Sequence, residues 1–128
     1  KAETATLGGQ QYELTAVTSA AEGAKVRDKM VSLKSMDDWL GEADKARQQY
    51  AANIISKAML DNAIQRYANA LSAAEGQGIV KKEELELMRE AMTSLSQGKD
   101  VIGALRKSHN RTREDLLEQY GAVPVRRR

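Results

Sequence analysis

The sequence contains no cysteine and no phenylalanine, and its 128 residues include one proline and one tryptophan. Without cysteine the chain has no disulfide, no thiolate metal site and no cysteine nucleophile, and its redox compartment is undetermined. Because aromatic residues are scarce, any core must consist mainly of Ala, Leu, Ile, Val and Met side chains. Alanine buries little apolar area, and burial contributes roughly 25 cal/mol per Å². We therefore expect modest stability for a single copy, with assembly supplying the rest.

Long apolar runs are also missing, since none approaches the ~20 residues that a membrane-spanning helix needs. We therefore expect no membrane span in this chain. The chain begins at Lys1 and not at Met. We expect either a processed protein or a part of a longer one, so the absence of a targeting signal carries no weight.

Helical periodicity is the strongest pattern that the sequence does contain. Between Asp37 and Leu95 there is no proline and there are only three glycines, and apolar residues recur at helical spacing. This pattern predicts an all-α fold of about four helices, a long helical hairpin or elongated bundle with coiled-coil-like packing. We divide the chain into a flexible arm over residues 1–10, a single helical domain over 11–121 and a basic tail over 122–128.

The first two predicted helices lie in the N-terminal half of the chain. The first covers residues 11–34. Ser35 has the form of a helix cap, and the second helix then runs from Asp37 to the glycines at 76 and 78. At 1.5 Å per residue the second helix would be roughly 55–60 Å long. A helix of that length needs a partner along it.

The last two predicted helices follow the glycines. The third covers residues 83–95, where four apolar residues follow the 3-4-3 spacing of a coiled-coil seam: Leu85, Met88, Met92 and Leu95. The fourth is capped by Asp100 and stops at Gly121. Thr112 is a second capping candidate, and it would interrupt this last helix.

One short segment, Ala73 to Glu84, resembles the calcium-binding loop of the EF-hand. Gly78 stands at the sharp-turn position, and Glu84 stands at the twelfth position of the loop. The segment departs from the EF-hand at positions that supply calcium ligands. The first, fifth and ninth positions are occupied by Ala73, Gln77 and Lys81. We therefore predict a glycine-containing turn without calcium, and we expect no metal site and no cofactor.

Residues that carry out catalysis are scarce. The only histidine, His109, lies in a basic polar segment without the partners of a zinc or di-iron site, and we expect it to be solvated. The carboxylates at 83, 84, 86 and 90 fit an acidic first turn that complements a helix dipole. The sequence contains no Ser/His/Asp arrangement, phosphate-binding glycine loop or dinucleotide motif. We expect no enzyme and no catalytic residues.

The charge is uneven along the chain. Residues 1–98 carry 12 basic and 14 acidic side chains, whereas residues 99–128 carry 8 and 4. The candidates for contact with an anionic partner are Arg106, Lys107, Arg111, Arg113, Arg126, Arg127 and Arg128. They support one alternative function, a small nucleic-acid-associated protein that uses its basic C-terminal region. The same residues can instead be basic side chains that complement the dipole of the last helix, followed by a solvated tail. No aromatic residue interleaves with the arginines, so the sequence does not support stacking on bases.

The leading interpretation is a non-enzymatic helical subunit that self-associates or binds a partner protein in a larger assembly. The composition resembles that of bacterial and phage assembly proteins, such as virion, ejection, scaffolding or secretion components. Adjacent apolar residues, as at Ile54 and Ile55, give the helices more than one apolar face. Large side chains dominate interfaces. The predicted interface residues are Trp39, Tyr50, Ile54, Tyr67, Leu85, Met88, Met92 and Leu95.

Overall fold

The computed structural model describes residues 2–126 of the chain, and these residues form four helices and three short strands. The helices are α1 (Ala20–Ala51), α2 (Lys57–Gly76), α3 (Lys82–Ser96) and α4 (Ile102–Gln119). The strands are β1 (Thr4–Leu7), β2 (Gln10–Leu14) and β3 (Ala122–Pro124). The predicted, mainly helical character is confirmed. The sheet corrects the all-α prediction, and coiled-coil-like packing stays a prediction.

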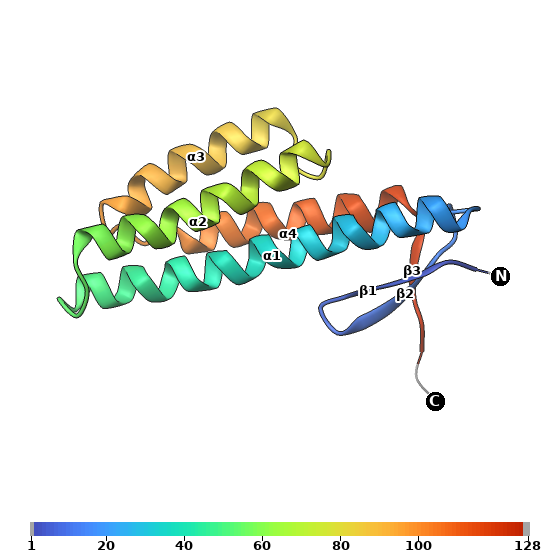
Figure 1. Cartoon of the computed structure of the whole chain (residues 1–128), viewed down its shortest axis with the longest axis horizontal. Helices are drawn as coiled ribbons and strands as arrows, with labels where there is room; N and C mark the ends of the chain where they lie inside the picture. The colour runs from blue at the N-terminus through green and yellow to red at the C-terminus, as the bar shows by residue number, and fades with distance from the viewer. Residues whose placement is uncertain (1, 127–128) are drawn as a thin grey trace.

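The helices form an up-and-down bundle in which successive helices run in opposite directions (Figure 1). α1 packs along α2, α2 along α3 and α3 along α4, and α4 packs back onto α1. With 32 residues, α1 is about 48 Å long. Its N-terminal part extends past the end of α2 and packs against β1. The sheet therefore lies at one end of the bundle, away from the turn between α1 and α2.

The first helix of each of the three helical hairpins, α1, α2 and α3, has the same kind of C-terminal end. The residue after each cap has a positive φ: 59° at Asn53, 74° at Gly78 and 80° at Gly98. At the first of these ends the amide of Ile54 donates to the carbonyl of Gln49 over 2.8 Å, and the equivalent bonds close the other two. This is the Schellman motif, which requires a left-handed residue. Glycine adopts that conformation without strain, and asparagine tolerates it.

The division between α1 and α2 corrects the predicted helix boundaries. The single helix expected from residue 37 to 76 is broken at residues 52–56, and the expected break at Ser35 does not occur. The fully buried apolar residues that surround Ser35 within α1 are Leu33, Met36 and Leu40. The true caps are Ser19 and Ser56, whose hydroxyls accept hydrogen bonds from amides three residues further on.

The sheet occupies segments for which the sequence predicted other structures. Its central strand β2 pairs antiparallel with β1 on one side and with β3 on the other. Gly8 and Gly9 connect β1 to β2, and their φ values of 59° and 80° match a type I′ hairpin turn. The sheet residues that are buried in the core are Ala5, Leu7 and Leu14. The helix expected from residue 11 was therefore wrong for residues 11–19, and the strands at residues 4–7 and 122–124 lie in the segments expected as an arm and a tail.

The last helix is continuous and ends where predicted. Thr112 is buried within α4 and donates to the carbonyl of Ser108 over 3.1 Å, so the expected interruption is absent. Asp100 accepts a hydrogen bond from the first amide of α4 over 3.3 Å. Beyond the helix, the carbonyl of Gly121 accepts bonds from the amide and hydroxyl of Thr15, over 3.1 and 2.6 Å. These bonds join the end of α4 to the end of β2.

None of the helices among the described residues is long and apolar enough to cross a membrane.

Candidate functional site

The predicted interface residues fall into two groups in the structure. Five of the eight are buried in the chain's own core: Tyr67, Leu85, Met88, Met92 and Leu95. By contrast, Ile54 is 70% exposed, and Trp39 and Tyr50 are half-buried. The five buried residues stabilise the bundle itself, so only the other three are accessible to a second chain. Their part in association stays a prediction.

The predicted contacts for an anionic partner are also divided. Three basic side chains are exposed on α4 and have no ion-pair partner within residues 2–126: Arg106, Lys107 and Arg111. Arg113 is turned inward, with Nη2 2.6 Å from Oδ2 of Asp37. Arg126 is exposed after β3, while Arg127 and Arg128 lie outside the described residues. The structure therefore does not gather the seven basic residues into one group among the described residues.

A polar cluster that is buried at its tyrosine and histidine and partly exposed at its aspartate and arginine joins three of the helices. It consists of Asp37 from α1, Tyr67 from α2, and His109 and Arg113 from α4, and we refer to it as the central polar cluster. His109 is 2% exposed, so the expectation of a solvated histidine was wrong. Its Nδ1 lies 2.7 Å from Oδ1 of Asp37, and its Nε2 lies 2.5 Å from the hydroxyl of Tyr67. A neutral ring that donates from Nδ1 and accepts at Nε2 satisfies both partners.

The environment of the central polar cluster keeps Asp37 charged and Tyr67 protonated. Burial acts to raise the pKa of Asp37, but the hydrogen bond from His109, together with the charge and hydrogen bond of Arg113, holds that pKa below its ordinary value of 3.8. Burial, assisted by the charge of Asp37, raises the pKa of Tyr67 well above its ordinary value of 10.0. At neutral pH Tyr67 is therefore a hydrogen-bond donor and not a base or a nucleophile.

The central polar cluster is committed to contacts within the bundle. The rings of Tyr67 and His109 stack with their centroids 5.6 Å apart, and both ring nitrogens of His109 have protein partners. A catalytic acid or base must come within hydrogen-bond reach of its substrate. The surface grooves between α1 and α2 and between α2 and α3 are lined by neither Tyr67 nor His109. We interpret the cluster as a device that sets the relative positions of α1, α2 and α4.

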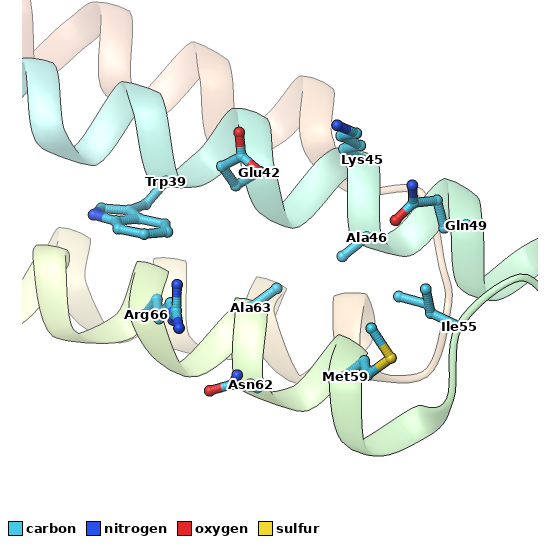
Figure 2. A pocket seen from close by; sticks show the side chains of 10 residues that line it. All are labelled: Trp39, Glu42, Lys45, Ala46, Gln49, Ile55, Met59, Asn62, Ala63 and Arg66. Carbon is cyan, nitrogen blue, oxygen red and sulfur yellow. The ribbon is translucent and has the colours of Figure 1, made fainter.

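Accessible apolar surface gathers on the outer face of α1 and α2. A groove of about 280 Å³ runs between these helices, and Figure 2 shows the side chains that line it: Trp39, Glu42, Lys45, Ala46, Gln49, Ile55, Met59, Asn62, Ala63 and Arg66. Two adjoining hollows share Trp39 and Arg66 and extend the groove to Val31 and Ala70. Val31 is 70% exposed and Met59 is 57% exposed. We term this continuous surface the outer groove.

The outer groove has a large aromatic side chain near its middle and small residues on the side toward the turn between α1 and α2. The indole of Trp39 projects between the two helices, and the guanidinium of Arg66 lies 5.4 Å from its ring centroid. Ala46 and Ala63 follow toward the turn, and Met59 lies beyond them (Figure 2). Small side chains leave a space between helices that a ridge of side chains on another helix can fill. The geometry suits contact with a further helix.

Comparisons with known proteins return no match, since no family model, curated protein or solved structure matches the chain. The segment that resembles an EF-hand loop, residues 73–84, forms the end of α2, the turn at Gly78 and the start of α3. Within residues 2–126, no three His, Cys, Asp or Glu side chains are grouped so that they could hold a metal ion.

The sequence held a signal for the buried histidine. The buried residues of α4 follow one another at spacings of 3, 4, 3 and 4: Ile102, Leu105, His109, Thr112 and Leu116. That spacing places His109 on the apolar face of the helix. Asp37 similarly lies four residues after Leu33 and three before Leu40, both fully buried in α1. Two polar residues on apolar faces indicate a buried pair, since each would otherwise lack a partner.

Proposed function

We propose that this chain is a non-enzymatic helical subunit that associates with another helical surface through the outer groove. One observation carries the proposal. Two exposed apolar side chains, Val31 and Met59, line the same continuous groove as the half-buried Trp39, the only tryptophan. Contiguous apolar surface on a folded protein marks interaction sites. Aromatic anchors set in hollows contribute most of the energy of such interfaces.

The dimensions and chemistry of the outer groove support a helical occupant. From Val31 to Gln49 it follows 19 residues of α1, or about 27 Å from first to last, which matches five turns of a helix. Trp39 offers a large apolar face together with an indole N–H that can donate to a polar neighbour. Because α1 and α2 lie side by side, a third helix can contact both at once.

A role in a larger assembly extends this proposal. Association through an exposed groove suits a structural, ejection, scaffolding or secretion component of bacterial or phage origin. The support for this narrower role is composition alone: the chain has no cysteine, few aromatic residues and long helices. The buried state of both nitrogens of His109 and the raised pKa of Tyr67 support the non-enzymatic part of the proposal.

Selection of helical peptides tests the use of the outer groove. A display library of random amphipathic helices is screened against the immobilised chain, and bound peptides are retested on variants. Met59→Glu should weaken binding by about tenfold or more, because it places an unpaired charge in the contact. Leu87→Glu is the matched control, since Leu87 is 62% exposed but lies on α3. Peptides that bind both variants equally well would refute the assignment of the groove.

Nucleic-acid binding is the second candidate function, and the exposed side chains of Arg106, Lys107 and Arg111 on α4 favour it. Three phosphate contacts would give a dependence of log affinity on log salt with a slope of about −2 to −3. The test is fluorescence anisotropy with labelled single-stranded and duplex oligonucleotides over a salt series, repeated after the three residues are replaced by Gln. Micromolar affinity near physiological salt that these replacements remove would place this function first.

A further inference from the structure

We infer that the occupant of the outer groove is a second copy of this chain, which lies antiparallel about a twofold axis at the level of Glu42 and Ala43. This inference rests on the proposed function, since it names the partner of the same groove. An interface about a twofold axis must be complementary to itself, because each copy presents the same surface to the other. The outer groove meets this condition in shape and in charge.

The shape of the outer groove is self-complementary along α1. Trp39 is its largest side chain, and Ala46, seven residues or two helical turns further on, leaves a space on the same face. An axis halfway between these two residues places Trp39 of each copy at the level of Ala46 of the other. Met59, on the α2 side of the groove, borders that space (Figure 2). Trp39 of each copy therefore lies opposite the part of the other copy's groove that Ala46 and Met59 line.

The charges on the rim of the groove follow the same symmetry. Glu42 and Lys45 are both exposed on α1, and neither has an ion-pair partner within residues 2–126. The axis that pairs Trp39 with Ala46 brings Glu42 within about 3 Å, measured along the helix, of Lys45 in the second copy. Two ion pairs then form across the interface, one on each side of the axis.

The other charged side chains that line the groove make contacts within one chain, of which only that between Lys34 and Asp38 is an ion pair. Lys34 lies 2.7 Å from Asp38, and Arg66 covers the ring of Trp39. Glu42 and Lys45 are the two charges on the α1 side of the rim that have no ion-pair partner within residues 2–126. An acidic or a basic partner would satisfy one of them and oppose the other, whereas a second copy of this chain satisfies both. This balance of charges favours a second copy of the chain over a partner whose surface is entirely acidic or entirely basic.

A charge exchange tests the twofold arrangement. The molar mass of the wild type, Glu42→Lys, Lys45→Glu and the double variant is measured by sedimentation equilibrium over a concentration series. Each single variant places like charges together at both symmetric positions, so the dimer dissociation constant should rise by about tenfold or more. The double variant exchanges the two charges and restores both ion pairs, so its dissociation constant should return to within about threefold of the wild type. Circular dichroism checks that each variant folds.

Two results would overturn the inference. A wild type that stays monomeric up to millimolar concentration would show that no second copy binds. A wild-type dimer that neither single variant weakens, or that the double variant does not restore, would show that the axis is wrong. Failure here is distinguishable from failure of the proposed function. A monomeric chain that still binds helical peptides, and loses them on Met59→Glu, retains the outer groove as a binding surface for a different helix.

Discussion

Arg66 and Tyr67 are neighbours on α2, yet Arg66 is exposed and Tyr67 is buried, and they take part in two contrasting contacts. Arg66 points outward and covers Trp39, whereas Tyr67 is fully buried against His109. α1 repeats this division, because Asp37 contributes to the central polar cluster and Trp39 lies in the outer groove. Both sites combine an aromatic ring with a nitrogen-containing side chain, a histidine inside and an arginine outside. In the central polar cluster, the polar groups find their partners within the bundle. The outer groove, by contrast, is open, and Glu42 and Lys45 on its rim have no ion-pair partner within residues 2–126.

The central polar cluster positions the helices of one chain, whereas the outer groove is the surface that we propose for association with another. Substitutions in the central polar cluster should lower the free energy of unfolding, since they leave buried groups without partners. Substitutions in the outer groove should leave that free energy nearly unchanged and should alter binding instead.

Asp37→Ala should have the largest effect. It removes the carboxylate from both His109 and Arg113, so we expect the free energy of unfolding to fall by about 2–3 kcal/mol, measured by urea denaturation. Asp38→Ala is the matched control on the next residue. Its partner, Lys34, is exposed at the surface, so that loss should stay below about 0.5 kcal/mol. Equal losses in the two variants would mean that the central polar cluster contributes no more than a surface ion pair.

Tyr67→Phe should have a smaller effect, because it keeps the ring and removes only the hydroxyl. The Nε2 atom of His109 then loses its partner, and we expect a loss of about 1–2 kcal/mol in the same assay. Tyr50→Phe is the control, since no hydrogen bond of its hydroxyl occurs among the described residues and the ring is half-buried. A neutral Tyr67→Phe would show that the hydroxyl does not help to position His109.

The smallest effect concerns pH. The pKa of Asp37 is depressed in the folded protein, so its contribution to stability is present above the ordinary value of 3.8 and is lost as the pH falls below it. Urea denaturation between pH 5 and pH 3, values of about one unit on either side of that pKa, should therefore show a steeper decline for the wild type than for Asp37→Asn. Parallel curves would show that the folded protein does not favour the ionised carboxylate.

Helix periodicity in the sequence predicted the bundle well where the local signal and the tertiary packing agree. The buried seam of α3 and the turns at Gly78 and Gly98 lie where the apolar spacing and the glycines placed them. The sequence does not predict the break at Asn53, because asparagine is a weaker left-handed signal than glycine, although Ser56 is a capping residue three positions later. At Ser35 the sequence predicts a break that does not occur, because the apolar residues packed around Ser35 override its local preference for a capping position.

The sheet and the candidate site depend on contacts between distant parts of the chain. β3 pairs with β2 across more than 100 residues, and no local pattern reports such a pairing. The Gly8–Gly9 turn between alternating residues is the one local signal for the hairpin, but a short segment with two glycines is equally typical of a flexible arm. The outer groove could not be predicted in advance, since helical spacing places Trp39 on a face without showing which helix covers that face.

The outer groove can be tested directly because Trp39 is the only tryptophan in the chain. Quenching of its fluorescence by acrylamide is measured as the protein concentration rises, alongside molar mass from light scattering. If a second copy covers the groove, the quenching constant should fall over the same concentrations at which the mass doubles. A mass that doubles while Trp39 stays equally open to acrylamide would place the contact elsewhere and would contradict the account.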